Sequence, residues 1–77
     1  MNMREKLLQI LNETCPGVDY ENETALVDDG YLESLDVVTV VTEIMDVFNI
    51  RMSIEDLLPE HFNSVDAMLE LISSAQK

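Results

Sequence analysis

Apolar residues recur at intervals of three and four in three stretches of the chain, a pattern typical of helices with one buried face. The sequence predicts these helices over Met3 to about Thr14, Ser34 to Phe48, and about Ser64 to Ser74. The second stretch is rich in β-branched residues, which favour strands, but it is too long for a strand of a small domain. The chain is therefore expected to be all-helical.

The segments between these helices are polar and differ in length. Residues 18–32 are acidic and are expected to form a long loop, with Asp28-Asp29-Gly30 marking a turn. Its apolar residues are expected to anchor it against the core: Val18, Tyr20, Leu26, Val27, Tyr31 and Leu32. A short helical turn is expected at Ile54 to Leu58, where Pro59 ends it. The predicted fold is one domain, residues 1–77, a small bundle of three main helices and one short helix.

Acidic residues dominate the charge of the chain. Its 77 residues include sixteen acids and four bases, which gives a net charge of −12. No Lys or Arg occurs from Leu7 to Ile50. Such a chain would repel nucleic acid and anionic membranes, and its field would steer it toward basic protein surfaces. With little basic surface and no large apolar patch predicted, a monomer is expected.

Cys15 is the only cysteine, so no internal disulfide can form, which fits a reducing compartment. We interpret Cys15 as a packing residue because no base partner is evident. The first residues carry charges among their apolar positions and lack a small-residue cleavage site, unlike a signal peptide. No apolar run approaches the length of a membrane span. A cytoplasmic protein is expected.

Ser34 is the candidate for chemistry, because it follows the long loop at the expected start of the second helix. It is expected to be the N-cap of that helix, as Asn63 or Ser64 is for the last one. Activating Ser34 as a nucleophile would require a base, and the only histidine, His61, is distant in the sequence. Ser34 therefore has the features of a residue that another protein modifies. A phosphodiester there would meet free backbone N–H groups and the positive end of the helix dipole.

The segment Gly30-Tyr31-Leu32-Glu33-Ser34-Leu35-Asp36 resembles the attachment motif of acyl carrier proteins, in which an acid, a serine and a leucine open the second helix. Residues 48–52 are similar to that family's end-of-helix Phe and alternating apolar loop, and residues 54–65 to its short third helix and the start of its fourth. The resemblance implies that Ser34 accepts 4'-phosphopantetheine from coenzyme A through a phosphopantetheinyl transferase. The thiol of this arm would carry acyl or aminoacyl groups as thioesters, and the chain itself would not be an enzyme.

The resemblance also implies that the second helix is recognised by loading and synthase enzymes with basic docking surfaces. Leu35 and Val38 would lie beside the arm, and Glu33 and Asp36 would meet basic residues of these partners. Glu43 and Asp46 would extend this surface, although an ordinary solvated helix face explains them equally well. Other residues of this half of the chain would be core: Val41, Ile44, Phe48, Phe62, Val65, Met68 and Ile72.

Two features depart from the family pattern. Glu33 stands where the family usually has Asp, which keeps the charge and adds one methylene. Thr39, Thr42 and Met45 stand where carriers of fatty-acid synthesis have more acids. This favours a specialised system, such as a polyketide, aminoacyl or D-alanyl carrier, as an alternative to fatty-acid synthesis.

Functions of other classes are alternatives to the carrier. An acidic interaction module without an arm would dock its second helix on a basic groove. Ser34 would then serve only as an N-cap, and its replacement by Ala would cost about 1 kcal/mol. A calcium loop fails on spacing, since Gly30 at the sixth position would put the first ligand at Ala25, and no metal site is expected. An enzyme is the least supported class, because neither clustered metal ligands nor a phosphate-binding glycine loop accompanies Ser34.

Overall fold

Four helices and long connecting segments make up the computed structural model of the chain, which describes residues 2–53 and 57–76. In chain order the helices are α1 (Met3–Thr14), α2 (Ser34–Phe48), α3 (Pro59–Phe62) and α4 (Val65–Ala75). The described residues contain no strand. The expected all-helical fold, with three main helices, one short helix and a long loop after the first, is confirmed.

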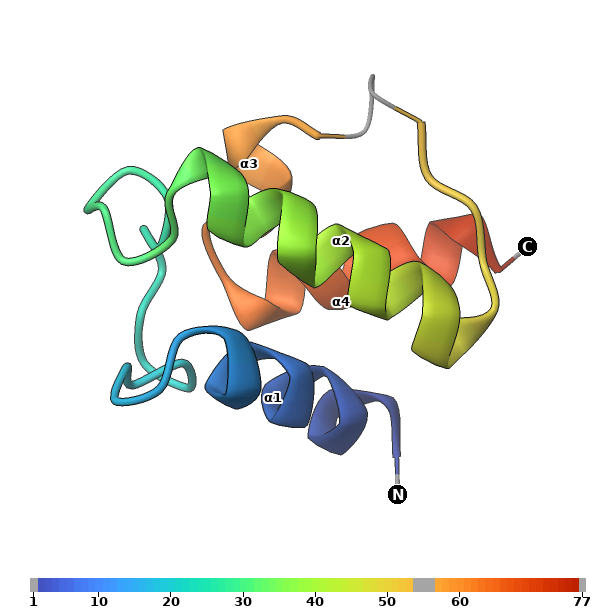
Figure 1. Ribbon diagram of the computed structural model, residues 1–77, viewed down its shortest axis with the longest axis horizontal. Coiled ribbons are helices and arrows are strands. Elements are labelled where there is room, and N and C mark those ends of the chain that lie inside the picture. The colour runs from blue at the N-terminus through green and yellow to red at the C-terminus, as the bar shows by residue number, and fades with distance from the viewer. Residues whose placement is uncertain (1, 54–56, 77) are drawn as a thin grey trace.

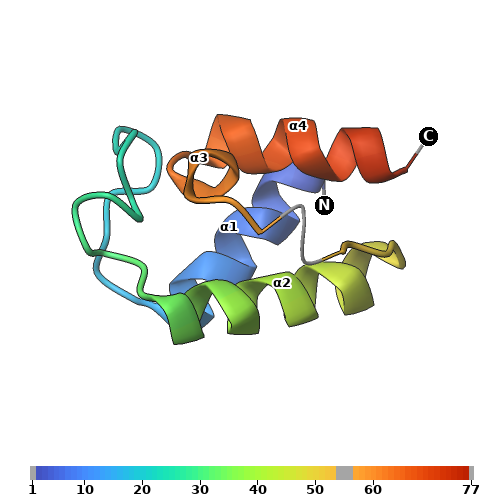
Figure 2. The same ribbon diagram turned by 90° about the horizontal axis from the view of Figure 1, so that it is seen from above.

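The helices bring one end of α2 close to α3 and to the long loop. Helix α1 packs against both α2 and α4, and α3 packs against α4. In Figure 1, α2 crosses the middle of the molecule in front of α4, with α1 below it. Figure 2, seen from above, separates α2 from α4. Both views place the α1–α2 loop and α3 at the end of the bundle where α2 begins.

One hydrophobic core joins the helices and the loop. Its buried members come from every helix and from three loop positions: Leu7, Ile10, Leu11, Tyr20, Leu26, Leu32, Val40, Val41, Ile44, Phe62, Val65, Met68 and Ile72. The expected core residues are therefore confirmed except Phe48, which is only partly buried. The prediction that Tyr31 anchors the loop was wrong, because its side chain is 44% exposed.

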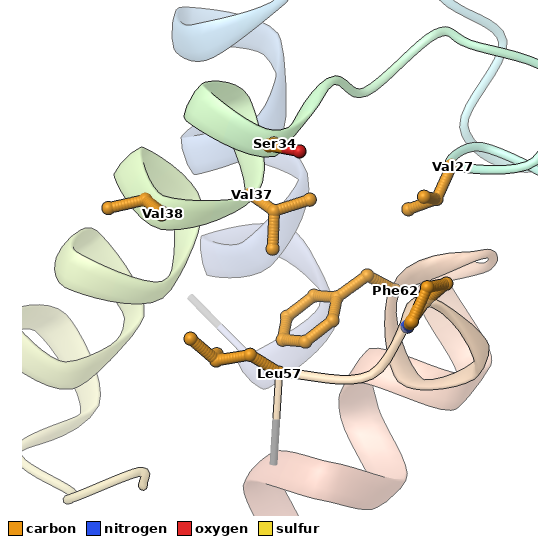
Figure 3. Close-up of a pocket in the computed structure, with 7 residues that line it drawn as sticks. Val27, Ser34, Val37, Val38, Leu57 and Phe62 are labelled. Carbon is orange, nitrogen blue, oxygen red and sulfur yellow. The ribbon is translucent and has the colours of Figure 1, made fainter. Parts of the chain in front are cut away.

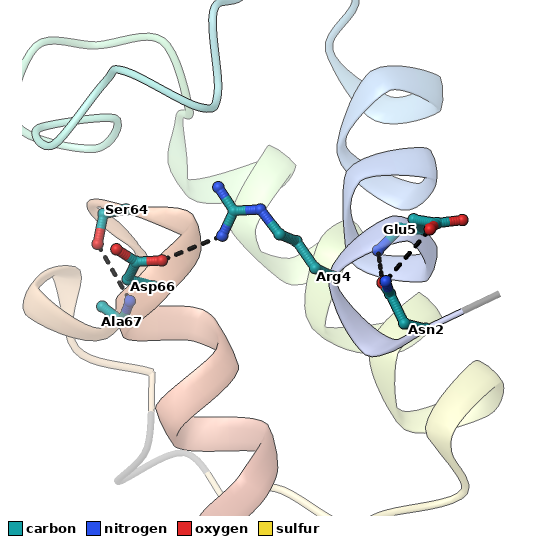
Figure 4. Close-up of polar contacts among 6 residues, drawn as sticks. All are labelled: Asn2, Arg4, Glu5, Ser64, Asp66 and Ala67. Carbon is teal, nitrogen blue, oxygen red and sulfur yellow. Dashed lines mark hydrogen bonds and ion pairs between the residues drawn. The ribbon is translucent and has the colours of Figure 1, made fainter.

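Polar contacts fix the starts of the first and last helices (Figure 4). Asn2 caps α1 and Ser64 caps α4, and each side-chain oxygen accepts a hydrogen bond from the backbone N–H three residues on. Arg4 of α1 forms an ion pair with Asp66 of α4 at 3.1 Å. Since the Asp66 side chain is largely exposed, this pair adds less than about 1 kcal/mol to stability.

The short helix lies later in the chain than predicted. The expected turn at Ile54 to Leu58 falls mostly on residues 54–56, which lie outside the described residues, and residues 57 and 58 are not helical. Pro59 begins α3 instead of ending a helix. Proline suits the first helical position because the N–H that it lacks would have no partner there and its fixed φ is already helical.

Tyr20 holds the α1–α2 loop against the core, and only 3% of this residue is exposed. Its hydroxyl lies within hydrogen-bonding distance of the carbonyl oxygens of Leu11 and Cys15, so it ties the loop to the end of α1. Burial, and to a smaller extent Cys15 and Asp36, raises the pKa of Tyr20 above its ordinary value of about 10. The Cys15 thiol donates to the carbonyl oxygen of Tyr31 at 3.3 Å. Cys15 is partly buried against the core, so it packs between the end of α1 and the loop before α2.

Candidate functional site

Ser34 is the first residue of α2, and the N-cap is Glu33 before it. The Glu33 N–H donates to the carboxylate of Asp36 at 3.2 Å, as in a capping box. The prediction that Ser34 is the N-cap was therefore wrong by one residue. The physical reason is that Glu33 has an acid three residues on, whereas Ser34 has Val37. The exposed Ser34 hydroxyl makes no hydrogen bond to any residue that the structure describes.

An apolar pocket of about 220 Å³ opens beside Ser34. Apart from Ser34, its lining residues are all apolar: Val27, Val37, Val38, Leu57, Pro59 and Phe62. In Figure 3 the Ser34 oxygen lies at the edge of this space and points toward the side on which Val27 lies, while Val37 points into it. The start of α2, the long loop and the region of α3 thus share one cavity next to a free hydroxyl.

Leu35 and Val38 occupy different sides of this site. Val38 is four residues after Ser34, so it lies on the same helix face and lines the pocket, although 52% of it remains exposed. Leu35 is 81% exposed and points away from the core. Since an exposed leucine beside the site is not used in packing the domain, it is available to a partner.

The acids predicted for partner recognition do not all lie near Ser34. Glu33 and Asp36 lie at the start of α2, next to Ser34, and share the cap. Glu43 instead lines a separate groove between α1 and α2, together with Lys6. Asp46 is exposed and lies about 18 Å farther along the helix axis than Ser34, from the rise of an α-helix. Only the first two acids therefore belong to the Ser34 site.

No titratable side chain lines the pocket among the residues that the structure describes. His61 lies in a different depression, with Glu60 and Glu70, so it is not placed to take a proton from Ser34. Within the described ranges, no group of three or more His, Cys, Asp and Glu side chains could hold a metal ion. Chemically, the site offers a free hydroxyl, an apolar cavity and the unpaired N–H groups of a helix start.

Most of the pocket was not predicted from the sequence. Val37 could have been found, because it is three residues after Ser34 and shares its helix face. The sequence predicts Val27 and Phe62 only as packing residues of the loop and the core, and Leu57 as part of a helical turn. These residues come from distant segments, and no local pattern shows that they meet Ser34.

Comparisons with known proteins do not identify a family for this chain. No protein-family model, curated protein or solved structure matches the chain. None of the helices that the structure describes is both long and apolar enough to cross a membrane. The resemblance of residues 30–36 to the attachment motif of carrier proteins therefore stays a prediction.

Proposed function

We propose that the chain is a carrier protein that holds acyl or aminoacyl groups as thioesters on a 4'-phosphopantetheine arm attached to Ser34. The observation that supports this most is the place of Ser34, whose exposed hydroxyl starts α2 at the edge of an apolar pocket. A transferase can reach such a hydroxyl. The resulting phosphodiester would meet the unpaired N–H groups and the positive dipole of the first helical turn.

The surroundings of Ser34 fit a hydroxyl that is modified by another protein. The described lining of the pocket contains no base that could activate Ser34 for catalysis. The phosphopantetheine arm supplies the thiol that bonds the cargo, and this chain supplies the attachment point and a cavity for apolar groups. A flexible arm raises the effective concentration of the cargo at each partner enzyme.

The alternative, an acidic interaction module without an arm, gave Ser34 the role of N-cap. Glu33 fills that role, so this alternative leaves the free hydroxyl of Ser34 without a purpose. The carrier gives a use both to the hydroxyl and to the pocket next to it. An unpaired Cys15 and an arm thiol that must stay reduced both suit the cytoplasm, where we infer that the protein works as a monomer.

Partner enzymes are proposed to dock on the start of α2 through basic residues. Replacing Glu33 by Gln keeps the shape of the side chain and removes its charge. We expect this change to raise the KM of the phosphopantetheinyl transferase about fivefold at low salt, the effect of roughly 1 kcal/mol. The matched change Asp46→Asn, far along the helix, should have little effect. Equal effects of both variants would mean that only net charge matters and that no docking site exists at Ser34.

Peptide mapping tests the proposal at the level of the residue. The wild-type protein is incubated with coenzyme A and a broad-specificity transferase and then digested. The mass of one phosphopantetheine should appear only on the fragment that contains Ser34. A folded protein that gains no mass with several transferases, or gains it on another fragment, contradicts the proposal.

A further inference from the structure

A single side chain, that of Asn63, holds the α1–α2 loop against the junction of α3 and α4. Its Oδ1 accepts hydrogen bonds from the backbone N–H groups of Val27 and Asp28, both at 3.0 Å. Its Nδ2 donates to the Asp28 carboxylate at 3.1 Å. Its backbone carbonyl accepts from the N–H of Leu26 at 2.9 Å. Consecutive residues of the loop are thus tied to one residue between two helices.

Asn63 is available for this contact because it is not needed at the helix ends. The sequence left open whether Asn63 or Ser64 caps α4, and the structure shows Ser64 in that role. Asn63 follows α3 with helical backbone angles, and its side chain is directed to the loop instead. We call these contacts of Asn63 with Leu26, Val27 and Asp28 the loop clamp.

The loop clamp lies directly behind the Ser34 pocket. Val27 on the loop side of the clamp lines the pocket, and so does Phe62, the residue before Asn63. The loop also leads from the clamp to the start of α2, because the Leu32 N–H donates to the carbonyl oxygen of Leu26 at 2.9 Å. If the clamp opened, Val27 would be free to move away and the pocket would lose one wall.

We propose that Asn63 is a positioning residue for the Ser34 site, which holds the Val27 wall of the pocket closed and so controls how well an apolar cargo is sheltered there. This inference rests on the proposed carrier function. A cargo that stays in a closed pocket keeps its thioester away from nucleophiles in solution. A cargo beside an open wall is exposed to them.

The clamp can be broken and restored by exchanging an amide for a carboxylate. Asn63→Asp keeps the shape and the acceptor for the loop N–H groups, but it replaces the Nδ2 donor with an oxygen that faces the Asp28 carboxylate. Adding Asp28→Asn returns a donor to this pair with the partners swapped. Asn22→Asp is a matched control. Asn22 also donates to an acid of the same loop, Asp19, at 2.8 Å, and its replacement by Asp changes the charge by the same amount as Asn63→Asp.

The first test measures thioester protection. Each variant is loaded by the transferase from the coenzyme A thioester of a medium-length saturated acid, and its fold is checked by circular dichroism. Hydroxylamine then attacks the thioester carbonyl, which releases the arm thiol and an acyl hydroxamate. Asn63→Asp should raise the cleavage rate about fivefold or more, and Asp28→Asn in the same chain should return it to near the wild-type rate. Asn22→Asp should leave it unchanged.

Equal cleavage rates in wild type and Asn63→Asp, or no rescue by the second change, would overturn the role of Asn63. An increase in Asn22→Asp as large as in Asn63→Asp would attribute the effect to charge alone and would also overturn it.

The second test needs no arm and separates the two proposals. Amide hydrogen exchange of Val27 and Asp28 in the unmodified protein should speed up in Asn63→Asp and return in the doubly changed chain. If the transferase never modifies the wild type, the carrier function fails, and exchange still decides whether Asn63 holds the loop. If the arm attaches but neither exchange nor cleavage responds, only the role of Asn63 fails.

Discussion

Ser34 and Ser64 both stand where a helix starts, yet replacing each by alanine should affect stability differently. The Ser64 hydroxyl accepts a hydrogen bond from the Ala67 N–H at 3.1 Å, which satisfies one of the unpaired donors of α4. The Ser34 hydroxyl has no such bond among the described residues, because Glu33 is the N-cap of α2. The same substitution therefore removes a cap at one site and only an exposed hydroxyl at the other.

The structure sets the expected magnitudes. Ser64→Ala should lower the free energy of unfolding by about 1 kcal/mol, the usual cost of a lost serine cap. For a domain of this size, such a loss lowers Tm by about 4–8 °C. Ser34→Ala should change the free energy by less than about 0.5 kcal/mol, since the site is exposed and alanine favours a helix more than serine does.

Thermal and urea unfolding of the unmodified proteins, followed by circular dichroism, measures both changes. The wild type is the reference, and the doubly changed chain should equal the sum of the single changes because the serines share no partner. A loss of about 1 kcal/mol in Ser34→Ala would show that its hydroxyl caps α2 after all. That result would refute the assignment of Glu33 as the cap and return the armless interaction module to consideration.

Three further changes test the packing of the domain. Because the folded state raises the pKa of Tyr20, the neutral phenol contributes its full stabilisation below about pH 10, and this contribution is lost as the pH rises further. In urea unfolding, the free energy of unfolding should therefore fall less steeply above pH 10 in Tyr20→Phe than in the wild type, while Tyr31→Phe should follow the wild type. Ile44→Val should cost about 0.5–1.5 kcal/mol in urea unfolding, and no loss would contradict its place in the core. Arg4→Ala should cost less than about 1 kcal/mol, and a loss that persists in 1 M salt would contradict an exposed pair with Asp66.

Local patterns were sufficient to predict the three main helices, but not the position of the short helix α3. The spacing of Leu7, Ile10 and Leu11 places them on the buried face of α1, and Pro16 and Gly17 follow the end of that helix. Helix α2 formed despite its β-branched residues because its apolar stripe can be buried only with helical periodicity. The sequence was less informative at the start of α2, where an acid at Glu33 replaced the expected serine as cap.

Long-range contacts explain what could not be predicted at the candidate site. Val27, Leu57 and Phe62 become neighbours of Ser34 only after the loop and α3 have packed at the start of α2. Asn63 illustrates the same limit, because its bonds reach residues 26–28 of a distant loop. An Asn before a helix looks like a cap in the sequence, and only the fold shows which partner it selects.

The most direct test of the carrier function is the intact mass of the wild type, Ser34→Ala and Ser64→Ala before and after incubation with coenzyme A and a phosphopantetheinyl transferase. Circular dichroism first confirms that each protein is folded. We expect the wild type and Ser64→Ala each to gain one phosphopantetheine and Ser34→Ala to gain none. A folded wild type that gains no mass, or a Ser34→Ala protein that gains the same mass as the wild type, would contradict attachment at Ser34.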